Sequence, residues 1–221
     1  MFDGLFSILA PHLCYSCGKT GAVLCENCKY DISSEYYVDC LVCGGPAGAS
    51  GICSGCPTSY SRGWCVGERS GALRKTVDSY KFYNNYAAHR DLAALLSQRM
   101  GMLPKNCIIV PVPTVASHIR QRGYDHTRLL ARRLAKLQGL PTKQLVYRQT
   151  ATKQRGENRE TRKRQATAAF GVRGKLDAKA VYLLVDDVIT TGATLHFAGK
   201  ALRDAGAGDV WVGVIARQPL D

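Results

Sequence analysis

The sequence predicts an α/β domain with a parallel sheet, preceded by a small cysteine-rich module. Two observations support this division. After about residue 66, short apolar runs alternate with helical patterns, as expected when helices cover both faces of a parallel sheet. Before that point, eight of the ten cysteines fall in four C-x-x-C pairs. We therefore expect a cysteine-rich module over residues 1–65 and an α/β domain over residues 66–221.

The first half of the domain begins with two helical patterns. Apolar residues at helical spacing predict helices over 71–82 and 86–100. The β-branched run 107–112, which Pro113 ends, predicts a buried strand. A basic helical region follows over 118–138, and the glycine and proline after it mark its end.

The second half repeats the alternation. Residues 144–148 predict a short strand, and the polar segment 149–167 has no apolar periodicity, so we expect a loop there. The near-continuous apolar run 180–185 is typical of a central parallel strand. A helix over 193–205 and a last strand over 209–216 complete the predicted domain.

The cysteine pairs predict two structural zinc sites. Their spacings are C-x2-C-x7-C-x2-C and then C-x2-C-x9-C-x2-C, so each tetrad can close a tetrahedral Cys₄ site. A module of this size has a small core and needs such a cross-link. Short loops favour sequential pairing, and interleaved pairing is the alternative. The predicted ligands are Cys14, Cys17, Cys25, Cys28, Cys40, Cys43, Cys53 and Cys56.

Disulfides or a redox centre are the other uses that these cysteines allow. A C-x-x-C pair is too local to join distant parts of a chain, which favours metal. The apolar stretch 1–10 lacks a preceding basic region, so we expect a packing segment and not a signal peptide. We accordingly expect a cytoplasmic protein with reduced thiols and no transmembrane helix. For Cys65 and Cys107, outside the pairs, we expect buried packing.

Charge is distributed unevenly along the chain. The net charge is +13, yet residues 1–65 hold three basic and five acidic residues. Residues 66–221 hold 27 basic and 12 acidic residues. The segments 114–136 and 148–164 are especially rich in basic residues. Because an anionic partner is attracted to a cationic surface, we expect the second part, and not the zinc module, to bind nucleic acid.

The strongest chemical pattern is the segment 181–195, VYLLVDDVITTGATL. A buried strand is expected to deliver Asp186 and Asp187 at its C-terminal end, where α/β sheets bind ligands. The turn that follows can bind a phosphate through backbone N–H groups at a helix N-terminus, and Gly192 allows close approach. The carboxylates can bind sugar hydroxyls or Mg²⁺. The alternative is a strand–turn–helix without a ligand, which an unpaired buried acidic doublet disfavours.

This segment resembles the 13-residue ribose-phosphate motif of type I phosphoribosyltransferases. The chain as a whole resembles the ComF (competence protein F) family, in which a cysteine-rich zinc module precedes such a domain. Matching segments include VPVP at 110–113 and RQRGYD at 120–125. The chain departs from the family pattern at Asp125-His126, where an Asn-Gln pair is expected. It also departs at 164–170, RQATAAF, where Arg-x-x-Asn is expected before Ala-Phe.

The resemblance implies a phosphoribosyl-ligand pocket that serves natural transformation, after single-stranded DNA enters the cytoplasm. We expect 5-phosphoribosyl diphosphate or a nucleotide as ligand, with Mg²⁺. Single-stranded DNA and DNA-uptake or recombination proteins are the expected partners. No base-recognition hood is visible in the sequence. The alternative is an active Mg²⁺-dependent phosphoribosyltransferase of nucleotide metabolism, with an unidentified acceptor and no DNA role.

The resemblance also implies roles for individual residues. Asp186 and Asp187 are the candidate catalytic residues and would position the ribose. The phosphoribosyl group is expected to contact Asp186, Asp187, Val188, Thr190, Thr191, Gly192, Ala193 and Thr194. The diphosphate is expected to contact Arg120, Arg122, Arg148 and Arg155. The charge pattern, and not the resemblance, gives the candidate DNA-binding residues Arg128, Arg132, Arg133, Arg162, Lys163 and Arg164, with Tyr124, Tyr147 and Phe170 as either stacking faces or core.

Overall fold

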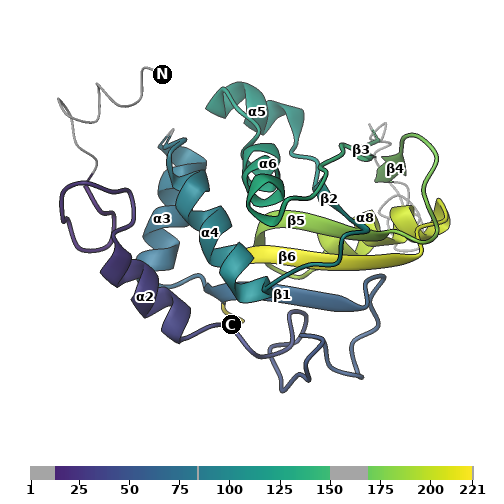
Figure 1. Ribbon diagram of the computed structural model, residues 1–221, viewed down its shortest axis with the longest axis horizontal. Coiled ribbons are helices and arrows are strands. Elements are labelled where there is room, and N and C mark those ends of the chain that lie inside the picture. Colours follow the sequence, from purple (N-terminus) through teal and green to yellow (C-terminus); the bar gives the residue numbers. More distant parts are fainter. Residues whose placement is uncertain (1–12, 84, 150–168, 221) are drawn as a thin grey trace, which may run out of the picture.

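A four-stranded parallel sheet with strand order β1-β6-β5-β2 forms the centre of the structure. This computed structural model describes residues 13–83, 85–149 and 169–220 (Figure 1). The strands are β1 (Arg62–Glu68), β2 (Cys107–Pro111), β5 (Val181–Ile189) and β6 (Asp209–Arg217). The predicted parallel α/β architecture is therefore confirmed.

Helices cover both faces of this sheet. Helices α3 (Gly71–Phe82), α4 (Ala88–Met100) and α6 (His126–Gln138) pack on one face, and α8 (Ala193–Asp204) packs on the other. Side chains of each strand enter the two cores in alternation, because successive side chains of a strand point to opposite faces of the sheet. These four helices agree with the predicted ones to within a few residues, apart from the start of α6.

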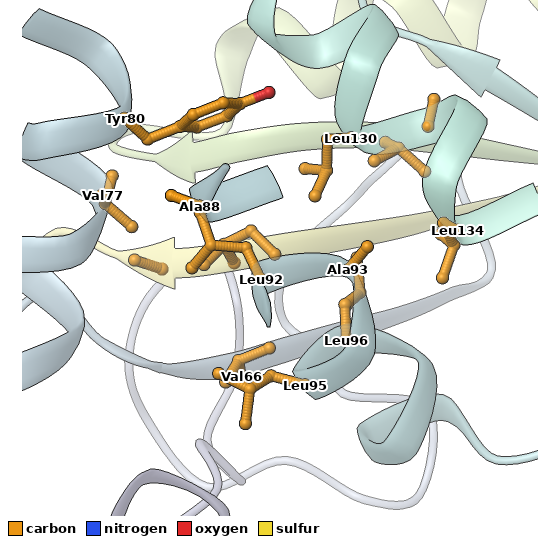
Figure 2. Packing of buried hydrophobic residues seen from close by; sticks show 14 of the residues in the cluster. Val66, Val77, Tyr80, Ala88, Leu92, Ala93, Leu95, Leu96, Leu130 and Leu134 are labelled. Atoms are coloured by element: carbon orange, nitrogen blue, oxygen red, sulfur yellow. The ribbon is translucent and has the colours of Figure 1, made fainter. Parts of the chain in front are cut away.

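The larger core lies between the sheet and helices α3, α4 and α6. Figure 2 shows Leu92 and Leu96 of α4 beside Leu134 of α6 and near Val66 of β1. All four are fully buried, so this layer supplies much of the apolar burial that stabilises the fold. Two further core residues, Cys65 and Cys107, are also buried, which confirms their predicted packing role.

Strand β1 was not predicted from the sequence. It pairs in parallel with β6, from Arg62 opposite Trp211 to Glu68 opposite Arg217. A glycine inside β1 weakens the strand pattern, but the packing requires it. A Cβ atom on Gly63 would lie 2.3 Å from the Leu41 side chain. Because β1 crosses the boundary expected at residues 65 and 66, its first residues belong to the main sheet, while the two-part division itself stays a prediction.

The single helix expected over 118–138 is two helices, α5 (Ala116–Arg122) and α6. Gly123 ends α5 in the left-handed region, at φ +76°, and its N–H donates to the carbonyl of Ile119. The Asp125 carboxylate then caps α6 by accepting a hydrogen bond from the Arg128 N–H, 3.2 Å away. The break places the first residue of α6, His126, beside Asp187 of β5.

Smaller elements complete the described chain. The predicted short strand is present as β3 (Val146–Arg148), which pairs in antiparallel fashion with β4 (Phe170–Val172). The loop expected over 149–167 lies almost wholly outside the described residues. Helix α2 (Glu26–Ser34) begins directly after Cys25 and contains Cys28, the other member of the second cysteine pair. Among the described residues, no helix combines the length and apolarity needed to cross a bilayer.

Candidate functional site

The eight paired cysteines gather into two tetrads. Within each tetrad the four sulfur atoms lie within 4.8 Å of one another, and one Sγ–Sγ distance is 3.6 Å in both. Four sulfurs about 2.3 Å from a tetrahedral zinc ion are about 3.8 Å apart, whereas a disulfide is about 2.05 Å long. Both tetrads therefore fit zinc, and their sequential pairing is confirmed. They are Cys14, Cys17, Cys25 and Cys28, then Cys40, Cys43, Cys53 and Cys56.

Backbone N–H groups favour the thiolate form of one cysteine in each tetrad. The N–H of Cys25 points to Cys14 Sγ and that of Cys53 to Cys40 Sγ, each at 3.4 Å. Burial raises the pKa of Cys14 and of Cys40. Backbone N–H donors outweigh this effect and lower both pKa values to about 6. The anionic sulfur that zinc requires is thus favoured near neutral pH.

The acidic doublet lies inside strand β5, not after it. The strand continues past the expected end at residue 185 because β6 pairs with it as far as Ile189 opposite Arg217. Alternation along β5 therefore sends Asp186 and Asp187 to different faces of the sheet. Asp187 faces the side that α3 and α6 cover, and Asp186 faces the side that α8 covers. The two carboxylates consequently have different surroundings.

Asp187 is buried, at 2% exposure, and faces the Lys81 ammonium and the His126 imidazole. Lys81 Nζ of α3 lies 3.0 Å from its Oδ1, and His126 Nε2 of α6 lies 2.8 Å from its Oδ2. Burial by itself raises the pKa of Asp187. The hydrogen bond from His126 and the charge of Lys81 outweigh burial and hold this pKa well below its usual range. Asp187 is therefore ionised, and each of its carboxylate oxygens already faces a nitrogen atom of Lys81 or His126.

Sequence reasoning missed Lys81 and His126. Arg122 Nη1 lies 3.1 Å from His126 Nδ1, so Nδ1 accepts from the guanidinium while Nε2–H faces Asp187. The one signal for His126 was the departure from the family pattern at Asp125-His126. Lys81 had no signal, because its partner Asp187 is distant in the chain.

Asp186 is partly buried and, among the described residues, forms no ion pair. The backbone N–H of Asp187 donates a hydrogen bond, 2.9 Å long, to Oδ1 of Asp186. Burial and the neighbouring charge of Asp187 raise the pKa of Asp186 to about 8. Arg148 approaches from β3, where its Nε donates to the Pro113 carbonyl and its guanidinium lies over the Phe170 ring. Asp186 is thus the carboxylate that a ligand can engage.

The turn after β5 leads into the N-terminus of α8. Gly192 adopts φ +76°, which a side chain would strain, and its carbonyl accepts the first helical hydrogen bond from His196. Thr191 Oγ1 lies 3.4 Å from the Ala193 N–H. Thr190 and Thr191 are exposed. The N–H groups and dipole of a helix N-terminus favour an anion, so this turn is suited to a phosphate.

A cavity of about 220 Å³ brings most of these groups together. Beside it, a small hollow of about 20 Å³ lies against Thr190, Gly192 and Thr194. Asp186, Val188 and Thr194 line both spaces, so the doublet and the turn share one site. The polar side chains that line the cavity are Lys81, Thr114, His118, Arg122, His126, Thr127, Arg148, Asp186, Asp187 and Thr194.

The predicted basic residues separate into three groups. Arg122 and Arg148 line the cavity, whereas Arg120 is exposed and does not. Arg132 is exposed on α6, and Arg128 and Arg133 of the same helix are partly buried. The remaining ones lie outside the described residues: Arg155, Arg162, Lys163 and Arg164.

The three aromatic residues considered for stacking are not open faces. Tyr124 and Phe170 are buried, at 8% and 6% exposure, so both belong to the core. Tyr147 is partly buried, and the Arg173 guanidinium lies over its ring. Any stacking face at the site must come from other residues.

Comparison with curated proteins gives several relatives that cover most of the chain. The chain is 32% identical over 211 residues to competence protein F of Haemophilus influenzae, covering 88% of this chain and 90% of the relative. It is 30% identical over 227 residues to DNA utilization protein YhgH of Salmonella typhi, covering 95% and 99%. It is 24% identical over 199 residues to competence protein ComFC of Bacillus subtilis, covering 85% and 81%. No protein-family model matches the chain.

Among solved structures, the chain is similar to glutamine phosphoribosylpyrophosphate amidotransferase from B. subtilis, with a TM-score of 0.46 and 16% identity. The similarity covers 62% of this chain and 30% of that chain. The allosteric regulatory enzyme of purine biosynthesis gives the same identity and coverage, with a TM-score of 0.45. These similarities concern the fold alone.

Proposed function

The chain belongs to the competence protein F family, and from this premise we propose that it binds 5-phosphoribosyl diphosphate or a nucleotide and handles single-stranded DNA in natural transformation. The names of its relatives concern competence and DNA utilization, which supports a role in DNA uptake. The observation that supports this ligand is the shared cavity, in which Asp186, a carboxylate without an ion pair among the described residues, lies beside a helix N-terminus.

The chemistry of this cavity suits a phosphoribosyl group. Asp186 accepts hydrogen bonds from ribose hydroxyls, and the turn at Thr190 and Thr191 holds the 5-phosphate through N–H and hydroxyl donors. Arg122 and Arg148, which line the same cavity, neutralise a diphosphate or a second phosphate. A ligand of this class meets a donor or an acceptor at each of its polar ends.

The two carboxylates have unequal roles in this proposal. Asp187 positions Lys81 and His126 and is not a ligand for the sugar, because both of its oxygens already face these groups. Asp186 contacts the sugar. It is also the carboxylate that remains to hold Mg²⁺, whose charge would lower its pKa. When bound, Mg²⁺ would neutralise the departing diphosphate, which favours transfer of the phosphoribosyl group.

Calorimetric titration of the full chain with 5-phosphoribosyl diphosphate, with and without Mg²⁺, tests the proposal. We expect binding that Mg²⁺ strengthens and that Asp186→Ala weakens at least about tenfold, the loss of one charge-assisted pair. Asp204→Ala, which removes an exposed carboxylate at the far end of α8, is the matched control and should bind as the wild type does.

Two outcomes contradict the proposed ligand. One is no heat of binding for 5-phosphoribosyl diphosphate or for a nucleoside monophosphate. The other is equal affinity for the wild type and Asp186→Ala. Release of inorganic diphosphate from the bound ligand, followed with and without DNA, then decides whether the protein also turns the ligand over.

A further inference from the structure

Three aromatic side chains are exposed where α3 ends and α4 begins. Phe82 is 59% exposed, Tyr83 is 76% exposed and Tyr86 is 48% exposed. Large aromatic side chains gathered at one surface are costly to hydrate and are enriched where a partner covers them. This cluster is separate from the aromatic residues that the sequence suggested for stacking.

A guanidinium joins this cluster to the cavity. Arg122 lies over the Phe82 ring, 5.3 Å from its centroid, and also lines the cavity that contains Asp186. The same side chain hydrogen-bonds His126, which faces Asp187. Lys81, next to Phe82 in the chain, forms an ion pair with Asp187. Through Arg122, the exposed ring of Phe82 therefore lies next to the candidate site.

The ring of Tyr86 is anchored by a buried aromatic residue. Its ring packs against the buried ring of Tyr124, with centroids 4.3 Å apart, and Tyr124 in turn hydrogen-bonds the carbonyl of Tyr80 in α3. These contacts fix Tyr86 against the structure although almost half of it is exposed. We call Phe82, Tyr86 and Arg122 together the stacking surface.

The cavity is small for a whole nucleotide. Its volume of about 220 Å³ is below the roughly 300 Å³ at which pockets for drug-sized ligands begin, so we expect a sugar and its phosphate to occupy most of it. We then expect an aromatic group attached to that sugar at the edge of the cavity. The stacking surface offers it two aromatic rings and a planar guanidinium, which are the groups on which nucleobases stack.

We propose that the stacking surface binds the nucleobase of a nucleotide whose 5-phosphate lies at the turn before α8. This inference rests on the proposed function, since it specifies the base as part of the ligand. The cationic groups that line the same cavity, Lys81, Arg122 and Arg148, match an anionic ligand. The base can belong to a free nucleotide or to the 5′-phosphorylated end of a single DNA strand.

The test compares ligands with and without a base. Ribose 5-phosphate, thymidine monophosphate and 5′-phosphorylated oligothymidylate are titrated into the full chain and into Phe82→Leu, which removes the π-face but keeps an apolar side chain. We expect Phe82→Leu to weaken at least one base-containing ligand on the order of tenfold, because stacking on one ring contributes about 1–3 kcal/mol. Ribose 5-phosphate should bind both proteins within about twofold.

Two further variants complete the experiment. Phe82→Trp should retain the affinity for the base-containing ligand, and Tyr30→Leu, which removes an exposed ring of α2, should leave every affinity unchanged. A selective loss for oligothymidylate alone identifies DNA as the source of the base, and a loss for the monophosphate identifies a nucleotide.

Binding of ribose 5-phosphate together with equal affinities of the wild type and Phe82→Leu for both base-containing ligands would overturn the stacking surface alone. Failure of all three ligands to bind the wild type would overturn the stacking surface, and if 5-phosphoribosyl diphosphate also fails to bind, the proposed function is overturned with it. An equal loss for ribose 5-phosphate and the monophosphate would show that Phe82 only shapes the cavity, which also contradicts the inference.

Discussion

Arg217 Nη2 donates a hydrogen bond, 2.8 Å long, to the carbonyl of Val42, which lies between two cysteines of the second tetrad. Its Nη1 donates to the carbonyl of Thr190 in the turn before α8, at 3.2 Å. The side chain is 1% exposed at the end of β6. One buried guanidinium thus joins the second tetrad to the turn on which the proposed phosphate depends.

Arg217→Met should therefore loosen the second tetrad, because Val42 and Thr190 lose their buried donor. We expect the zinc ion of that tetrad to pass to a chelator more than about fivefold faster, since an unsatisfied buried carbonyl costs about 1–3 kcal/mol. The first tetrad should release its zinc ion at the wild-type rate. A chromophoric chelator follows both phases, with Arg132→Met as an exposed-arginine control. Unchanged release from both tetrads would contradict the coupling.

Purified protein should contain two zinc ions per chain, because each tetrad offers four sulfur ligands. Elemental analysis by plasma emission spectrometry should give about one zinc ion per chain for Cys53→Ser, which removes one ligand of the second tetrad. Cys65→Ser is the matched control and should keep both ions, since Cys65 is buried away from both tetrads. Metal-free protein from a reducing purification would refute the assignment.

Asp187→Ala should destabilise the fold more than Asp186→Ala does. Removing one partner of a buried ion pair typically costs about 3–5 kcal/mol, because the remaining charge is left without compensation. Here Lys81 and His126 would both lose their partner. Urea unfolding measures the free energy of unfolding, and Asp204→Ala should change it by less than about 1 kcal/mol. Equal stability of the two doublet variants would contradict this division of roles.

The raised pKa of Asp186 should appear in the pH dependence of stability. This pKa is about 8 in the folded protein, against about 4 in an unfolded chain. Between these values the folded state binds the proton more tightly, so the contribution of Asp186 to stability falls as pH rises from about 4 to about 8. Asp186→Asn should remove this loss.

Differential scanning calorimetry at several pH values checks this expectation. The melting temperature of Asp186→Asn should exceed that of the wild type by about 3 °C or more at pH 8, and by less at pH 5. A constant difference across this range would mean that Asp186 does not titrate there.

Single-stranded DNA should bind through the basic second part, without strong sequence preference. For a single strand the logarithm of affinity falls with the logarithm of salt at about −0.7 per phosphate neutralised. Arg128→Ala with Arg132→Ala should reduce this slope by about 1.4 if α6 contacts the strand. Arg74→Ala with Lys75→Ala, two exposed charges of α3, is the control. DNA affinity confined to residues 1–66 would reverse the assignment.

The sequence predicted the strand–turn–helix of residues 181–195 well because all of its signals are local. An apolar run, a glycine with positive φ and the helix after it lie within fifteen residues. The cysteine tetrads were equally accessible, since their spacing alone brings the ligands together. The break between α5 and α6 also had a local signal, the glycine at 123 followed by a capping Asp125, which the basic helical pattern obscured.

Long-range partners account for what the sequence did not predict. Lys81 resembles any exposed lysine near a helix end until β5 brings Asp187 to it. The different fates of Asp186 and Asp187 depend on how far β5 extends, and its pairing with β6 decides that. The exposed aromatic residues were also not predictable from the sequence. Phe82 and Phe170 are the same residue type, and only the folded structure exposes the first and buries the second.

The position of β1 at the edge of the sheet has a consequence for synthesis on the ribosome. Its only partner strand in the described structure is β6, the last strand of the described residues. Residues 62–68 therefore leave the ribosome long before their partner exists, whereas the ligands of each tetrad lie within a short segment, 14–28 and 40–56. Because contacts distant in sequence form late, we expect the cysteine tetrads to form first and the sheet edge to close only after residues 209–217 have been translated.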